Sequence, residues 1–86
     1  MYNYQTEREN IFSDNGVEML LKIRDKVQKL LEEAGAFTME NAIQPASGSS
    51  WTMLACVDYL VETGEIREVT APDTCAAQYR IFAVAK

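Results

Sequence analysis

The residues of this sequence that could do chemistry are a cysteine and two carboxylates within one short stretch, Cys56, Asp58 and Glu62. A thiol becomes a strong nucleophile when a neighbouring imidazole takes its proton, and paired carboxylates can exchange protons with a substrate. The chain has no histidine, so Cys56 lacks this activator and the commonest general base near neutral pH is missing. Carboxylates four residues apart on a helix usually form a solvated face, and we expect that role for Asp58 and Glu62.

Other signs of an enzyme or a metal protein are missing from the sequence. The stretch SGSS at 47–50 is too short for a phosphate-binding loop and lacks its lysine. There is no Cys-x-x-Cys pair and no histidine to complete a zinc set. We also expect a chain of 86 residues to be too short to enclose a pocket of roughly several hundred Å³. The sequence therefore predicts no catalytic residue, metal or cofactor, with Cys56 and Cys75 as free thiols; a disulfide between them is the alternative.

The charge balance limits the choice of partners. The chain carries 13 acidic and 8 basic residues, a net charge of −5. Such a chain repels nucleic acids and anionic membranes unless its bases gather in one place. No apolar run approaches the roughly 18 residues of a membrane span, and residues 1–10 do not resemble a signal peptide. We therefore expect a cytoplasmic protein without membrane contact.

The clearest element is a helix over residues 17–34. Its apolar residues recur at helical spacing and predict one buried face: Val17, Leu20, Ile23, Val27, Leu30, Leu31 and Ala34. The pairs Glu18–Lys22 and Asp25–Lys29 have the favourable order for ion pairs along a helix. Arg24 projects at the edge of the apolar face, so we expect its stem to cover the core while its guanidinium pairs with an acid.

The remaining elements are shorter. Residues 1–13 lack periodicity and are expected to be loosely ordered, although Tyr2, Tyr4, Ile11 and Phe12 could pin them to the domain. The turn residues at 13–16 should precede the long helix, and Gly35 should end it. A very short strand at 36–37 precedes a helix at 39–44, which Thr38 caps. A third helix spans 51–63 after a serine cap, and strands at 65–70 and 77–84 flank a loop at 71–76.

The order helix, short strand, helix, helix, hairpin resembles the winged helix-turn-helix superfamily over residues 17–84. The most specific segment is LVETGEI, in which Leu60, Gly64 and Ile66 match the recurrent L-x-x-x-G-x-I at the end of the recognition helix. The segment QPASGSS at 44–50 departs from the pattern because it is longer than the usual turn. The resemblance implies an α+β winged-helix domain at 14–86, with three helices and a C-terminal β-hairpin wing.

Most bacterial members of that superfamily bind DNA, with the third helix in the major groove and the wing on phosphates. Helical projection places Met53, Leu54, Val57, Leu60 and Val61 toward the core, and the opposite face would then meet the DNA. The DNA contacts implied by this hypothesis are Ser49, Ser50, Thr52, Tyr59, Arg67 and Arg80.

The charges of that surface argue against DNA. The third helix has no Lys or Arg, while Asp58 and Glu62 would repel phosphates. Half of the cations, Lys22, Arg24, Lys26 and Lys29, lie among acids on the first helix. Arg67 and Arg80 alone could reach a DNA backbone, and two phosphate contacts give weak, salt-sensitive binding.

The same helix face suits a protein partner better. Trp51, Ala55 and Tyr59 form a ridge at i, i+4, i+8 spacing with Glu62 beside it, and Trp and Tyr are enriched at binding hot spots. Two structural alternatives compete: Trp51 packs inward, or Tyr2, Tyr4 and Phe12 cover the ridge within one chain. We rank first a non-enzymatic module that contacts a protein partner or a second copy through the third helix. The alternative is a DNA-binding transcriptional regulator.

Overall fold

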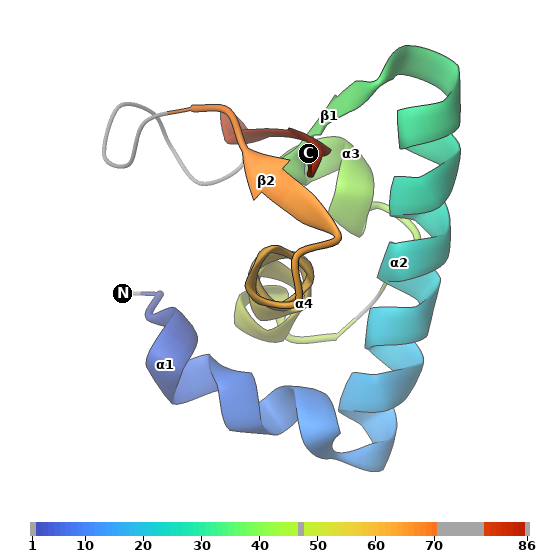
Figure 1. The fold of residues 1–86 in the computed structure, drawn as a ribbon. Coiled ribbons are helices and arrows are strands. Elements are labelled where there is room, and N and C mark those ends of the chain that lie inside the picture. The colour runs from blue at the N-terminus through green and yellow to red at the C-terminus, as the bar shows by residue number, and fades with distance from the viewer. Residues whose placement is uncertain (1, 47, 71–78, 86) are drawn as a thin grey trace.

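The computed structural model describes residues 2–46, 48–70 and 79–85, and their fold is of the α+β type. Figure 1 shows one helix near the centre, seen almost end-on, with the other elements arranged around it. In chain order the elements are α1 (Tyr4–Glu7), the 3₁₀ helix η1 (Arg8–Phe12), α2 (Asp14–Ala34), β1 (Ala36–Thr38), α3 (Met39–Ile43), α4 (Ser50–Glu62), β2 (Ile66–Glu68) and β3 (Ile81–Val84).

Helix α2 confirms the predicted long helix and begins three residues earlier, because Ser13 caps it. The Ser13 hydroxyl accepts a hydrogen bond from the Gly16 amide at 3.1 Å, and Gly35 ends the helix at a φ of 76°. The middle of the predicted apolar face is correct, since Ile23 and Val27 are buried. Its two ends are wrong, since Val17 is 42% exposed and Ala34 is also exposed.

The predicted ion pairs of α2 have mixed outcomes. Lys29 pairs with Asp25 at 3.8 Å, and the Arg24 guanidinium binds Glu65 at 2.9 Å, as its position at the edge of the apolar face predicted. Glu18 and Lys22 form no ion pair in the described part of the chain. Exposed side chains gain little from such pairing, so this difference has little energetic weight.

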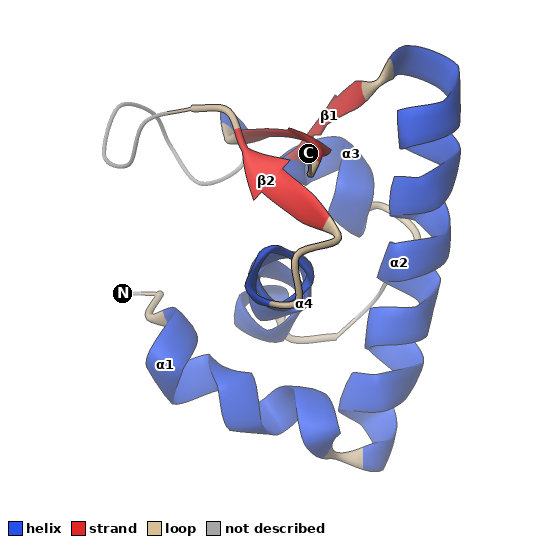
Figure 2. Cartoon of the chain, viewed as in Figure 1, coloured by secondary structure: helices blue, strands red, loops and turns tan. Residues whose placement is uncertain are grey.

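The three strands form one antiparallel sheet in the order β1-β3-β2. The short strand predicted at 36–37 is confirmed, and Phe37 lies opposite Phe82 of β3 with the two rings stacked at 5.5 Å. Figure 2 shows the sheet at the opposite end of the molecule from the N-terminal helical turns. Strands β2 and β3 are shorter than predicted, and the predicted loop at 71–76 lies outside the described residues.

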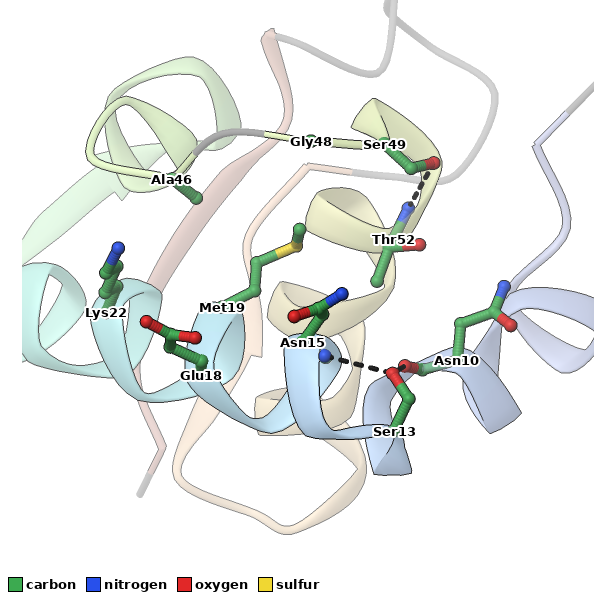
Figure 3. A pocket seen from close by; sticks show the side chains of 11 residues that line it. Asn10, Ser13, Asn15, Glu18, Met19, Lys22, Ala46, Gly48, Ser49 and Thr52 are labelled. Atoms are coloured by element: carbon green, nitrogen blue, oxygen red, sulfur yellow. Dashed lines mark hydrogen bonds between the residues drawn. The ribbon is translucent and has the colours of Figure 1, made fainter.

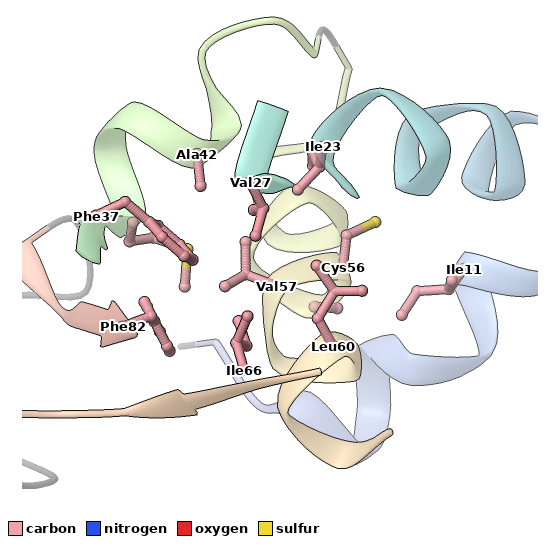
Figure 4. Packing of buried hydrophobic residues seen from close by; sticks show 12 residues of the cluster. Ile11, Ile23, Val27, Phe37, Ala42, Cys56, Val57, Leu60, Ile66 and Phe82 are labelled. Atoms are coloured by element: carbon pink, nitrogen blue, oxygen red, sulfur yellow. The ribbon is translucent and has the colours of Figure 1, made fainter. Parts of the chain in front are cut away.

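Helix α4 begins and ends close to the predicted positions, with Ser49 as its cap. Its burial differs from the prediction, because the helix is covered on more than one side. Val57 and Leu60 are buried as expected, but Ala55 and Thr52, predicted on the outward face, are buried too. Figure 4 shows Val57, Cys56 and Leu60 of α4 among side chains from α2, the sheet and η1. Because α4 supplies the middle of the core, a two-faced projection does not describe it.

The N-terminal residues provide the additional cover over α4. The sequence predicted a loosely ordered segment at 1–13, whereas residues 4–12 form the helical turns of α1 and η1. Ile11 has no exposed surface and belongs to the core. In Figure 1 these turns, coloured blue, cross beneath α4 and join the base of α2. Residues 4–12 therefore share one hydrophobic core with the remainder of the domain.

Gly16 explains how closely this segment lies on α2. It is buried in the first turn of the helix. A Cβ added there would lie 2.7 Å from the carbonyl carbon of Ile11 and would overlap the carbonyl oxygen of Asn10. Only glycine allows η1 and α2 to approach this closely, so the sharp turn between them depends on that residue.

Candidate functional site

The outward side of α4 is the surface that the sequence nominated for binding. Its polar residues Asp58, Tyr59 and Glu62 all contact other parts of the chain. The contacts come from the N-terminal segment and from the sheet, which lie far from α4 in the sequence. We call this set of contacts the α4 network, comprising Tyr2, Tyr4, Arg8, Phe12, Asp58, Tyr59, Glu62, Glu68 and Arg80.

Arg80 is the centre of one half of the α4 network. Its guanidinium donates to Asp58 at 2.8 Å and to Glu68 at 2.7 Å, and its side chain is only 20% exposed. The bonds to Glu68 raise the pKa of Arg80, and those from Arg80 lower the pKa of the Glu68 carboxyl. Two carboxylates around one guanidinium satisfy the fork geometry of arginine. Arg80, which directly precedes β3, therefore joins the start of that strand to α4 and to β2.

Tyr2 extends this half of the network to the N-terminus. Its hydroxyl donates a 2.6 Å hydrogen bond to the Asp58 carboxylate. Partial burial, followed by that bond, raises the pKa of the Tyr2 phenol. The phenol therefore stays protonated at neutral pH and acts as a hydrogen-bond donor.

Glu62 is the centre of the other half. The Arg8 guanidinium donates to both of its oxygens at 2.8 and 2.7 Å, and the Tyr4 hydroxyl donates at 2.6 Å. These bonds, first those from Arg8 and then the bond from Tyr4, lower the pKa of the Glu62 carboxyl to about 2. Glu62 is therefore fully ionised at neutral pH, and its charge is matched by Arg8.

An aromatic contact closes the network. The rings of Phe12 and Tyr59 meet edge to face at 5.6 Å, and the Arg8 guanidinium lies over both, 5.3 Å and 5.8 Å from their centroids. Such contacts favour a defined placement of each ring. The ridge predicted on α4 is therefore covered in part by Phe12, one of the residues that the sequence offered as a cover.

The four residues predicted for a protein interface have different environments. Trp51 is 43% exposed at the start of α4, Tyr59 is partly buried against Phe12, and Glu62 is exposed but paired with Arg8. Ala55 is fully buried and cannot form the expected notch. The structure brings Tyr59 and Glu62 into one network and leaves Trp51 outside it.

The residues predicted for DNA contact are divided as well. Ser49, Ser50 and Arg67 are exposed, whereas Thr52 is 7% exposed and Tyr59 is partly buried. Arg80, one of the two arginines expected to reach a DNA backbone, is held between two carboxylates. The predicted surface therefore offers a polyanion fewer positive charges than the sequence suggested.

A pocket of about 490 Å³ lies between α2, the end of η1 and the start of α4. The pocket is partly open to solvent, so the expectation that so short a chain could not enclose a cavity of this size stays a prediction. The QPASGSS segment supplies one wall through Ala46, Gly48 and Ser49, and the N-terminal segment supplies another through Asn10. Figure 3 shows the side chains of Asn15, Met19 and Thr52 around it. Both walls come from segments whose placement the sequence pattern did not predict.

The Cys56 thiol has little access to a substrate. Cys56 is fully buried, and that burial raises the pKa of its thiol to about 12.

Within residues 2–46, 48–70 and 79–85, no three His, Cys, Asp or Glu side chains gather closely enough to hold a metal ion. No helix in the described ranges is both long and apolar enough to cross a membrane. Cys75 lies outside the described residues, so its predicted state stays a prediction.

Sequence reasoning offered Tyr2 and Tyr4 as cover for this side of α4 but missed Arg8 and Arg80 as partners of its acids. The side chains of Tyr2, Tyr4 and Arg8 are all hydrogen-bond donors within one short N-terminal stretch. This cluster of donors was the feature of the sequence that could have indicated partners for the acids.

Comparisons of the chain with protein-family models, with curated proteins and with solved structures return no match.

Proposed function

We propose that this chain is a non-enzymatic interaction module of the winged-helix type that binds a protein through the exposed start of α4. The order of elements from α2 to β3 and the strand order β1-β3-β2 support the winged-helix assignment. The sequence segment LVETGEI supports it independently. It spans the end of α4 and the beginning of β2, where the superfamily pattern expects it.

The distribution of paired charge is the observation that carries the choice of protein over DNA. Arg8, Arg24 and Arg80 each pair with an acid from a distant part of the chain. The chain is also acidic overall, with a net charge of −5. A phosphate backbone attracts clustered cations that are free to replace its counterions. Arginines already engaged with carboxylates would have to give up those bonds first.

Trp51 supports the location of the contact. It keeps 43% of its surface exposed in the first turn of α4, whereas the other end of the predicted ridge is engaged by Phe12. A large aromatic side chain buries much area on binding and loses little rotamer entropy, which makes it a frequent hot spot. The contact therefore centres on Trp51 rather than on the whole ridge.

Light scattering coupled to size exclusion tests self-association. If a second copy is the partner, the protein elutes as a dimer, and Trp51→Ala shifts it to a monomer. Tyr79→Ala is the matched control, because Tyr79 is an exposed aromatic residue beside the sheet. If the protein is monomeric, a pull-down with wild type and with both variants tests a different protein partner. Loss of a captured protein with Trp51→Ala alone supports the proposal.

A titration with mixed-sequence duplex DNA at low salt tests the alternative function. We expect no saturable binding at micromolar concentrations. Micromolar binding that weakens with Arg67→Ala, and falls steeply as salt rises, would replace our proposal with a DNA-binding regulator.

A further inference from the structure

Three large apolar side chains stay exposed where η1 meets α2. Phe12 is 53% exposed, Val17 42% and Leu21 57%. Phe12 directly precedes Ser13, the cap of α2, and Val17 is the fourth residue after that cap. Side chains at these two positions pack together in the hydrophobic staple of a helix start. Val17 and Leu21 are four residues apart on one helix, so they are neighbours as well. We call these three side chains the α2 strip.

Both ends of the α2 strip lie toward the C-terminal end of α4. Phe12 meets the ring of Tyr59 at 5.6 Å, and Arg24, which follows the strip along α2, binds Glu65 at 2.9 Å. Trp51 lies near the opposite end of α4, eight residues before Tyr59, which is about 12 Å along the helix axis. The α2 strip is therefore a surface separate from the Trp51 contact.

The hydrophobic core does not account for the strip. Ile23 and Val27 of the same helix are buried in that core, whereas Val17 and Leu21 lie outside it. Single apolar side chains on a surface need no explanation, but adjoining ones commonly mark an interaction site. A partner that covers the strip would remove this apolar surface from water.

Acidic side chains border the strip along α2. Asp14, Glu18 and Asp25 are exposed, and each lies three or four residues from Val17 or Leu21. Within the described part of the chain, Asp14 and Glu18 form no ion pair. A partner therefore meets apolar side chains with carboxylates beside them.

The two arginines beside the strip do not offset these acids. Arg8 pairs with Glu62 at 2.7 Å, and Arg24 pairs with Glu65 at 2.9 Å. A second copy of the chain would bring the same acids into the contact, and like charges across an interface oppose binding. A partner with Lys or Arg beside its apolar side chains is complementary instead.

We propose that the α2 strip binds an amphipathic helix of another protein, with apolar side chains on one face and lysine or arginine along its edges. A helix suits the strip, because its own side chains at three- and four-residue spacing can pack between Val17 and Leu21. This contact is additional to the one at Trp51 and does not depend on it. The chain would then hold two partners, one toward each end of α4.

Titration with a synthetic helical peptide of leucine and lysine, with all leucines on one face, tests the surface. In two-dimensional NMR we expect saturable shifts at the amides of Val17, Glu18 and Leu21. A scrambled peptide of the same composition has no apolar face and should bind at least about tenfold more weakly. A peptide with glutamate in place of lysine should not bind, because it meets the acids of α2.

Matched variants separate the apolar part from the charged part. Leu21→Ala should weaken peptide binding about tenfold, because more than half of this side chain is still available for burial. Val69→Ala is its control, since Val69 is similarly exposed but lies next to the sheet. Glu18→Gln should weaken binding about threefold and reduce its salt dependence. Glu33→Gln, at an exposed position on another side of α2, should bind like wild type.

Three results would overturn the proposal. The first is equal binding by wild type and Leu21→Ala, with both folded by circular dichroism. The second is a set of shifts centred on Trp51 instead of the strip. The third is a dimer in light scattering that Leu21→Ala converts to a monomer, which would assign the strip to a second copy. Trp51→Ala should leave peptide binding unchanged, so the failure of this proposal and that of the Trp51 contact are distinguishable.

Discussion

Replacing Gly16 by alanine tests how the N-terminal segment is attached to the domain. Helix propensity alone predicts a gain, since alanine in a helix is more favourable than glycine by about 1 kcal/mol. The structure predicts a loss instead. A Cβ at this position would overlap the Asn10 carbonyl oxygen and lie 2.7 Å from a backbone carbon of Ile11. These are backbone atoms, so no change of rotamer can relieve the contact.

The size of the loss follows from what must move. Separating η1 from α2 strains a packed contact, at about 1–3 kcal/mol, and exposes part of Ile11, whose full burial is worth about 2–3 kcal/mol. After subtraction of the propensity gain, we expect a net destabilisation of about 2–4 kcal/mol. For a domain of this size, that lowers the melting temperature by about 10 °C or more.

Urea unfolding and thermal melting followed by circular dichroism measure this effect. Asn15→Ala is the matched control, because it places the same residue at the adjacent, exposed position of α2. We expect it to be neutral or slightly stabilising. If Gly16→Ala proves as stable as Asn15→Ala, the close approach of η1 to α2 is wrong, and so is the proposed N-terminal wall of the pocket.

Three further predictions concern titration, reactivity and the α4 network. An NMR titration of the Glu62 carboxyl should give a pKa of about 2, and in Arg8→Gln that pKa should return toward its ordinary value. Because folding lowers the pKa, the ionised Glu62 stabilises the folded state above about pH 4.5, and this contribution is lost as pH falls toward 2. An unchanged pKa in the variant would contradict the ion pair. Cys56 should resist a thiol reagent at pH 8 in the native state and react on unfolding, measured in a Cys75→Ser background; fast native labelling would show that the helix is not covered. Arg80→Met should lower the free energy of unfolding by about 1–3 kcal/mol, because two partly buried carboxylates lose their shared donor. Chemical denaturation measures this change, and an unchanged stability would show that Arg80 is not the centre of its half of the α4 network.

Local signals in the sequence were sufficient for most helix boundaries. Ser13, Thr38 and Ser49 accept hydrogen bonds from amides in the first turns of their helices, and Gly35 has the positive φ of a helix end. Capping and hydrophobic spacing depend on residues within a few positions of one another, so a single sequence contains them. The short strand at 36–37 was also predicted, and β1 spans Ala36–Thr38.

The candidate sites depended on contacts between distant residues. Tyr2 and Asp58 are 56 positions apart and Arg8 and Glu62 are 54 apart, so no local pattern couples them. The prediction of a surface ridge on α4 treated the helix as having one covered side. The structure packs η1 against α4 as well, and Ala55 is fully buried.

The sequence by itself determined the elements from α2 onward, the acidic charge and the lack of an imidazole, because these follow from residue types and short-range spacing. Only the tertiary structure decided which surfaces remain free. Burial and ion pairing depend on which segments meet in space, and here the N-terminal turns meet α4. In this arrangement Arg8 forms an ion pair with Glu62, the pocket lies beside Thr52, and Trp51 remains exposed.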